Sequence, residues 1–167
     1  MTWDFVIIGA VVIILIILIR RIPRAKEISE KEAPEVTDEE MTLYGLISQS
    51  DDAFDRKDFE KAESLYIKAA AQDPNNPKIY SRLGAIYLEQ RNYYDAKDAF
   101  SQAIKIDPDN ASRHINLGLA FLGLKDYYKS VQTFQDALEL DPKNKKYRDL
   151  LDRAQKAKER EERRIKR

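Results

Sequence analysis

The sequence "RNYYDAKDAFSQAIKIDP", residues 91–108, returns in altered form as "KDYYKSVQTFQDALELDP" at residues 125–142. A more distant copy, "KDFEKAESLYIKAAAQDP", occupies residues 57–74. The interval is 34 residues each time, measured between Pro74, Pro108 and Pro142. Self-similarity at a fixed interval of this length indicates a chain built from stacked copies of one supersecondary unit.

Each copy has the apolar spacing of two helices. In the middle copy the residues at helical spacing are Tyr80, Leu83, Gly84 and Tyr87 in the first helix, and Ala96, Phe100 and Ala103 in the second. The small residues predict a close approach of the two helices, and the Asp-Pro pair predicts the end of the second. Only five glycines and six prolines in 167 residues argue against a turn-rich all-β fold.

The interval and the pattern resemble the tetratricopeptide repeat, an antiparallel pair of helices. The resemblance implies an all-α fold, a right-handed α-α superhelix of three repeats at residues 43–76, 77–110 and 111–144, followed by a C-terminal capping helix with a basic tail at residues 145–167. The family favours glycine in the turn between the helices, where this chain has Lys57, Arg91 and Lys125. A left-handed backbone there would cost each residue about 1 kcal/mol relative to glycine, and a turn of different shape is the alternative.

The segment "FVIIGAVVIILIILI", residues 5–19, carries no charge. With Trp3 at one interface and Arg20 and Arg21 reaching back to the other, it supplies about 18 residues of a membrane span, which needs about 17–25. A cleaved signal peptide is the alternative, but no basic residue precedes the segment and "RRIPRAK" follows it. We therefore predict a transmembrane anchor at residues 1–22 and a flexible acidic linker at residues 23–40.

The basic residues around this segment predict its orientation. They all follow it, which places the N-terminus outside and the repeats in the cytoplasm. The overall plan resembles prokaryotic inner-membrane repeat adaptors and, more loosely, mitochondrial outer-membrane import receptors. This resemblance implies a single-pass protein of the prokaryotic plasma membrane.

Catalytic and metal-binding patterns are missing from the sequence. The chain has no cysteine and one histidine, which excludes thiolate and histidine-rich metal sites. It has no nucleophile motif, P-loop or dinucleotide fingerprint. His114 occupies the position equivalent to Tyr80, which predicts a packed or half-buried side chain rather than a catalytic base. We predict a protein that is not an enzyme and uses no cofactor.

The family resemblance implies partner binding on the concave side, at the second, fifth, sixth, ninth and twelfth positions of each repeat. These positions hold Tyr44, Ile47, Ser48, Asp51 and Asp55; then Lys78, Ser81, Arg82, Ala85 and Leu88; then Ser112, Ile115, Asn116, Leu119 and Leu122. The lysine, asparagine and arginine clamp by which some family members hold heat-shock chaperone tails is matched at none of its five positions. The positions instead include an apolar strip, formed by Ala85, Leu88, Ile115, Leu119 and Leu122. This strip suits an amphipathic helix or an extended apolar segment, unless the C-terminal helix covers it.

The predicted function is therefore that of a membrane-anchored adaptor or scaffold, and the alternative is a structural repeat protein that assembles into homo-oligomers at the membrane. Residues 145–167 carry 11 basic and 5 acidic side chains. We expect this segment to cap the stack, with contact to anionic lipid as the alternative. Nucleic acid is not expected as a partner, because the 29 basic and 29 acidic residues balance and no aromatic residues interleave the basic ones of the tail.

Overall fold

The computed structural model describes residues 38–166, which form seven α-helices and no strands. The helices are α2 (Asp38–Asp55), α3 (Phe59–Gln72), α4 (Pro77–Glu89), α5 (Tyr93–Ile106), α6 (Ala111–Gly123), α7 (Tyr127–Leu140) and α8 (Lys145–Ile165). The predicted anchor at residues 1–22 lies outside the described residues, as does the predicted linker up to residue 37. Residues 38–40, assigned to the linker above, already belong to α2. Across residues 38–166, no helix is both long enough and apolar enough to span a bilayer.

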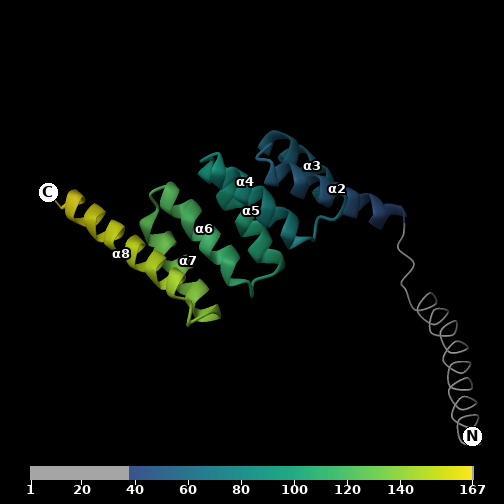
Figure 1. The fold of residues 1–167 in the computed structure, drawn as a ribbon. Helices are drawn as coiled ribbons and strands as arrows, with labels where there is room; N and C mark the ends of the chain where they lie inside the picture. The colour runs from purple at the N-terminus through teal and green to yellow at the C-terminus, as the bar shows by residue number, and fades with distance from the viewer. Residues whose placement is uncertain (1–37, 167) are drawn as a thin grey trace, which may run out of the picture. The chain divides into compact units, whose positions relative to one another are not determined.

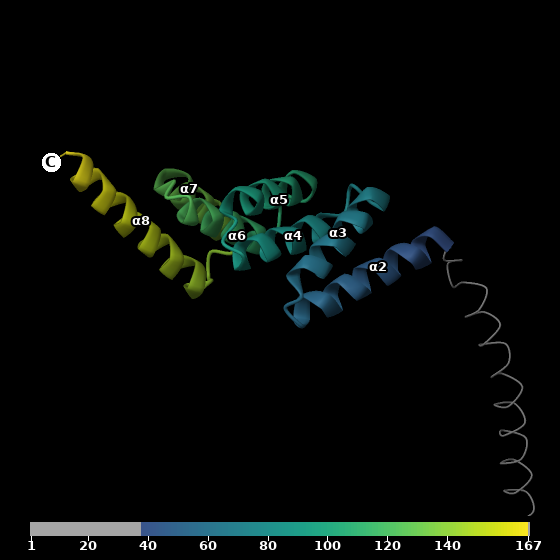
Figure 2. The same ribbon diagram turned by 90° about the horizontal axis from the view of Figure 1, so that it is seen from above.

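The helices of residues 39–166 are stacked in chain order (Figure 1), and the turned view in Figure 2 shows α2 at one end and α8 at the other. Helix α4 packs against α5 and α6 packs against α7, while α3 meets α4, α5 meets α6 and α7 meets α8. Each hairpin therefore covers the apolar side that its neighbour would otherwise expose to water, which is the reason such units are stable only in a row. The predicted all-α stack of repeats is confirmed.

Short polar residues set the ends of the helices. Asp58 and Asp126 accept hydrogen bonds from the backbone N–H groups of Lys61 and Lys129, at 3.3 and 3.1 Å, and so cap α3 and α7. Helix α4 begins with Pro77, whose missing N–H costs nothing at a first position. The second helix of each pair ends one residue before the aspartate of an Asp-Pro pair, as the sequence predicts.

Glycine is required where the two helices of a hairpin meet. A Cβ placed on Gly84 would lie 2.8 Å from the ring of Phe100, and one on Gly118 would lie 2.4 Å from the ring of Phe134. Both phenylalanine side chains are completely buried. The close approach predicted from the repeat pattern is thus present in the second and third hairpins.

The turns between paired helices have a left-handed residue. Lys57, Arg91 and Lys125 have φ angles of 61°, 59° and 61°, and these are the only non-glycine residues with positive φ in residues 38–166. The first of the two alternatives for these turns is therefore correct. Each lysine or arginine has a conformation that costs an L-residue roughly 1–2 kcal/mol.

Ile79 and Ile86 are the buried anchors that the sequence analysis overlooked. Both are completely buried on α4, in a cluster that joins α2, α3 and α4. Tyr80 and Tyr87, which the helical spacing places on the apolar face of this helix, are only half-buried. The hydroxyl groups of both tyrosines bind polar partners, as a phenol that is partly removed from water requires. Tyr87 donates to Glu63 at 2.8 Å.

One hydrogen bond recurs at each joint between repeats. The hydroxyl of Tyr80 donates to the carbonyl oxygen of Pro74 at 3.1 Å. The Nε2 atom of His114 lies 2.8 Å from the carbonyl oxygen of Pro108, and Nη2 of Arg148 donates to that of Pro142 at 3.0 Å. Three chemically different side chains at 34-residue intervals thus bind the carbonyl oxygen of the proline in the Asp-Pro pair of the preceding unit. His114 is half-buried, as predicted.

Candidate binding groove

Six of the predicted groove residues line one hollow of about 340 Å³. It lies between the N-terminal halves of α4 and α6. The predicted residues that line it are Lys78, Ser81, Arg82, Ala85, Ser112 and Asn116, and they are joined there by Asn110 and Arg113. The hollow is rich in hydrogen-bond donors and holds three cationic side chains.

Three more predicted residues line a second hollow of about 550 Å³, between the C-terminal ends of the same two helices. Leu88, Leu119 and Leu122 form its apolar part. Tyr93 closes one side by lying against Gly123, where a Cβ would come within 2.3 Å of the tyrosine ring. This hollow offers an apolar surface with Glu89 and Arg91 at its edge.

The two hollows lie along the same pair of helices, because α4 and α6 line both. Lys78 in the first hollow and Leu88 in the second are ten residues apart on α4, a distance of about 15 Å at 1.5 Å per residue. One end of the groove is therefore cationic and the other apolar. We refer below to the two hollows together as the groove.

Asp51 neutralises part of the cationic end from within the chain. Its carboxylate lies 3.0 Å from Nε of Arg82 and 3.4 Å from Nζ of Lys78, and it accepts a hydrogen bond from the hydroxyl of the buried Tyr66. These contacts link the first hairpin to the second. Arg113 pairs with Asp107 and donates to Oγ of Ser81 at 3.0 Å, so its guanidinium is held at the floor of the first hollow.

The pKa values of Asp51 and Tyr66 reflect this contact. Partial burial by itself would raise the pKa of Asp51, but the hydrogen bond from Tyr66 and the charges of Arg82 and Lys78 bring it below its ordinary value. Burial and the hydrogen bond to Asp51 raise the pKa of Tyr66 above its ordinary value. At neutral pH the network is therefore an ionised carboxylate held by one phenol and two cations.

Part of the predicted apolar strip lies against the C-terminal helix. Ile115 is 5% exposed and belongs to a cluster with Phe134 and Ala154, against which Leu119 and Leu122 pack together with Leu150 of α8. Ile115 therefore contributes to the core. Leu119 and Leu122 remain half-buried and line the second hollow as well.

The other predicted residues on α2, which are Tyr44, Ile47, Ser48 and Asp55, line neither hollow. Tyr44 is 65% exposed, whereas Ile47 is half-buried against the first apolar cluster. Conversely, Asn110, Arg113 and Tyr93 line the groove but fall outside the family's contact positions. No periodic signal in the sequence singles them out, because their placement depends on the joint between the second and third repeats.

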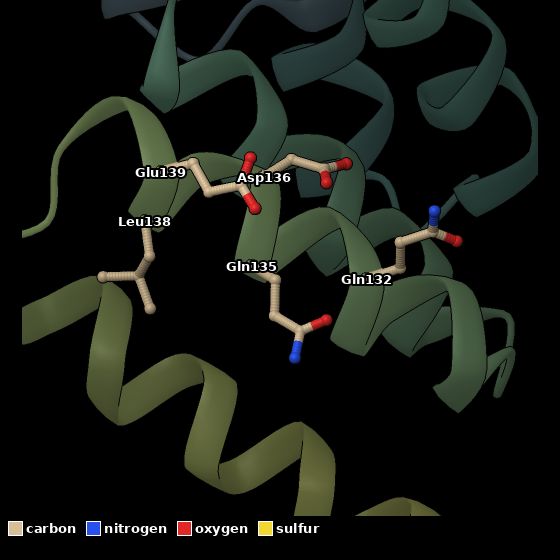
Figure 3. A pocket seen from close by; sticks show the side chains of 5 residues that line it. All are labelled: Gln132, Gln135, Asp136, Leu138 and Glu139. Carbon is tan, nitrogen blue, oxygen red and sulfur yellow. The ribbon is translucent and has the colours of Figure 1, made fainter.

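A further hollow, of about 560 Å³, lies on α7. Figure 3 shows its lining side chains, Gln132, Gln135, Asp136, Leu138 and Glu139, all of which come from this one helix. Because no second element contributes a polar group to it, this surface lacks the convergent side chains of a binding site.

The groove lies within segments that match known repeat families. Residues 77–110 and residues 111–144 each match a model described as "Tetratricopeptide repeat". Residues 51–91 match one described as "TPR repeat". Together these matches run without a break from residue 51 to residue 144. Comparison with curated protein sequences gives no significant match.

Solved structures share the fold at low sequence identity. The Arabidopsis OM64 TPR domain aligns with a TM-score of 0.67 at 24% identity, over 71% of this chain and 98% of that one. The second TPR domain of human RPAP3, solved with the HSP70 peptide SGPTIEEVD, aligns with a TM-score of 0.67 at 23% identity, over 70% and 98% of the two chains.

The Sgt2 TPR domain from Aspergillus fumigatus gives a TM-score of 0.67 at 24% identity, over 73% of this chain and 82% of its own. Identities this low establish the fold alone. The repeat matches, the stacked hairpins and the glycine contacts agree with one another: residues 51–144 of this chain consist of tetratricopeptide repeats.

Proposed function

We propose that this protein is a non-catalytic adaptor that binds a segment of another protein in the groove between α4 and α6. The observation that carries the proposal is the division of this groove into a cationic end and an apolar end on the same two helices. TPR neighbours solved with bound peptides, such as human RPAP3 with an HSP70 peptide, support peptide binding as the mode of action.

The groove favours a partner of particular chemistry. A carboxylate on the partner would meet Lys78, Arg82 and Arg113, and an apolar side chain would meet Leu88 and Leu122. A separation of about 15 Å corresponds to four or five residues of an extended segment, at about 3.3 Å per residue. The partner segment therefore has an acidic residue and an apolar residue at this spacing.

The chaperone-tail clamp remains unmatched in this groove. Its positions hold Ile47, Asp51, Arg82, Ser112 and Asn116, and the carboxylate of Asp51 would repel a second carboxylate at that point. An internal acidic segment is a better partner than a chain end, because it brings one fewer carboxylate to this end of the groove.

We also propose that residues 1–22 anchor the protein in the plasma membrane, with the repeats in the cytoplasm. The uncharged segment of residues 5–19 and the basic residues that follow it support this. A tether raises the concentration of the groove near membrane-bound partners, so that a weak site is sufficient. Protease added outside sealed cells is expected to leave the repeats intact; digestion there would contradict the orientation.

Photo-crosslinking in intact membranes tests the groove. A photoreactive residue in place of Ser112, which is exposed at the first hollow, is expected to give a discrete crosslinked product. The same residue in place of Gln135, exposed on α7, is the matched control and is expected to give none. Equal crosslinking at both positions would show that the groove is not the binding surface.

A charge reversal distinguishes specific binding from proximity. Lys78→Glu is expected to reduce the Ser112 product about tenfold, because it places a carboxylate where the partner's would lie. Lys105→Glu makes the same change at an exposed position of α5 and is expected to leave the product unchanged. A product with the mass of two copies of this chain would instead favour self-assembly, the alternative drawn from the sequence.

A further inference from the structure

Helix α8 presents a basic face to solvent. Its exposed residues include Lys145, Lys146, Arg148, Arg153, Lys156, Arg160, Arg163 and Arg164. The exposed acidic residues of the helix are Asp149, Asp152 and Glu159. Arg153, Lys156, Arg160 and Arg163 follow the i, i+3, i+7, i+10 spacing of one helix face and form a straight line of cations, which we call the basic stripe.

One of the acidic residues that alternate with basic ones near the C-terminus, Glu162, is directed away from the basic stripe. Glu162 is turned toward the repeats and accepts a hydrogen bond from the hydroxyl of Tyr128 at 2.7 Å. Lys158, one helical turn earlier, lies 4.3 Å from the centre of the Tyr128 ring. Glu162 therefore lies on the inner side of α8 and the stripe on the outer side.

Ion pairs within α8 engage two of the four residues of the basic stripe. Lys156 pairs with Asp152 at 2.6 Å, and Arg163 with Glu159 at 3.1 Å. Both pairs are exposed to solvent, where such contacts are weak and exchange readily for other partners. Arg153 and Arg160 have no carboxylate within 4.0 Å among the residues that the structure describes.

Basic charge is concentrated at this end of the chain. Residues 42–144 carry sixteen acidic and thirteen basic side chains, whereas residues 145–167 carry five acidic and eleven basic ones. A helix of this kind, with a row of cations on one side, is the pattern that binds anionic lipid headgroups. Its C-terminal end extends from the end of the stack in both views (Figures 1 and 2).

We propose that the basic stripe of α8 docks on a membrane surface that contains anionic lipid. Ten residues separate Arg153 from Arg163, so the stripe is a straight row about 15 Å long that fits a plane of headgroups. The stripe has no aromatic residue to stack on bases, which disfavours single-stranded nucleic acid. The proposed membrane anchor adds a reason to prefer lipid over an acidic protein, and this step alone depends on the proposed function.

Vesicle sedimentation tests the proposal with residues 39–167, which lack the predicted anchor. This part forms a compact unit whose apolar clusters are drawn from within it. We expect it to bind vesicles of phosphatidylserine and phosphatidylcholine but not vesicles of phosphatidylcholine alone. Binding is expected to fall steeply as salt is raised, because the attraction is electrostatic. Absence of binding to the anionic vesicles at low salt would overturn the proposal.

Matched variants locate the contact. Arg153→Gln with Arg160→Gln is expected to weaken vesicle binding at least tenfold, since each basic residue near such a surface contributes about fivefold. Lys68→Gln with Lys105→Gln removes the same charge from exposed positions on α3 and α5 and is expected to change binding less than twofold. An equal loss of vesicle binding in the two double variants would mean that the net charge of the protein, and not the basic stripe, is responsible for binding. Circular dichroism verifies that both pairs remain helical.

Two further measurements separate the outcomes. A DNA duplex that binds more tightly than the anionic vesicles at the same salt would identify a nucleic-acid partner and overturn the lipid proposal. Lys78→Glu, which impairs the groove, is expected to leave vesicle binding within twofold. Failure of the groove in crosslinking and failure of the basic stripe on vesicles are therefore distinguishable results.

Discussion

Replacing Gly118 by alanine places a methyl group where the ring of Phe134 already lies. The new Cβ would be 2.4 Å from one ring carbon and 2.6 Å from the next. Carbon atoms in ordinary contact are about 1 Å farther apart, so one of the helices must move. The ring has no free side to move into, because Phe134 is completely buried, and Oγ of Ser130 ties α7 to the carbonyl oxygen of Gly118 at 2.9 Å.

The expected change in the free energy of unfolding is the difference between two opposing effects. Overpacking of a closed core costs about 1–3 kcal/mol, and an overlap of this size against a buried ring belongs at the upper end. Alanine recovers about 1 kcal/mol relative to glycine inside a helix. We therefore expect Gly118→Ala to lower the free energy of unfolding by about 2 kcal/mol, which is several degrees in Tm for a domain of this size.

Gly45 provides the matched control. It lies in α2, and a Cβ added there meets nothing within 4 Å, so Gly45→Ala is expected to raise the free energy of unfolding by about 1 kcal/mol. Urea unfolding followed by circular dichroism measures both variants on residues 39–167. A Gly118→Ala protein as stable as the parent would refute the reasoning. Phe134→Leu combined with Gly118→Ala is expected to cost less than the sum of the two single changes, because the smaller side chain leaves room for the methyl group.

Three other outcomes are expected. Lys125→Gly should raise the free energy of unfolding by about 0.5–1 kcal/mol, because the strain of a positive φ at lysine is larger than the extra conformational entropy that glycine loses on folding. An unchanged urea midpoint would contradict this. Asp51→Asn should destabilise the protein at neutral pH but less so in acid. Because the pKa of Asp51 is lowered in the folded state, its contribution to stability is present above the pKa of the unfolded chain and disappears as pH falls through the pKa of the folded protein. A difference in stability between the two proteins that stays constant across acid titration would disprove this. Burial and the hydrogen bond to Glu63 raise the pKa of Tyr87 to about 12. Ultraviolet titration should therefore show a phenolate step at high pH that Tyr87→Phe abolishes. The stability that this contact contributes should be lost as pH rises through the same pKa.

The fold was predictable because its determinants repeat. Gly84 and Gly118 recur with Phe100 and Phe134 at the same interval, and each pair marks a place where two helices touch. The turn residues could be located in the same way, although the sequence left their backbone conformation open. A packing contact that recurs at a fixed interval can be recognised from the sequence alone, because each repeat needs the same residue types at the same positions.

The groove was predictable only in part because its special features do not repeat. Asp51 meets Lys78 and Arg82 across 27 and 31 positions of the chain, and neither the second nor the third repeat has an equivalent contact. Arg113 reaches the first hollow through its pairing with Asp107. Long charged side chains choose their partners by tertiary proximity, which depends on how one hairpin is placed on the next.

The outward orientation of the basic stripe was also hidden in the sequence. Glu159, Glu161 and Glu162 interrupt the basic residues when the letters are counted in order, which favours the capping role over a contact with anionic lipid. In the structure Tyr128 holds the Glu162 carboxylate on the inner side, whereas Glu159 pairs with Arg163 of the stripe. A linear count of charges cannot distinguish two sides of one helix.

The contact between His114 and the carbonyl of Pro108 has a consequence for the side chains that this joint tolerates. A carbonyl oxygen only accepts, so the imidazole is the donor and Nε2 carries the hydrogen in this contact. The equivalent positions hold a phenol and a guanidinium, which also donate. A substitution that keeps a donor at this place therefore keeps the second and third hairpins joined, and one that offers only an acceptor does not.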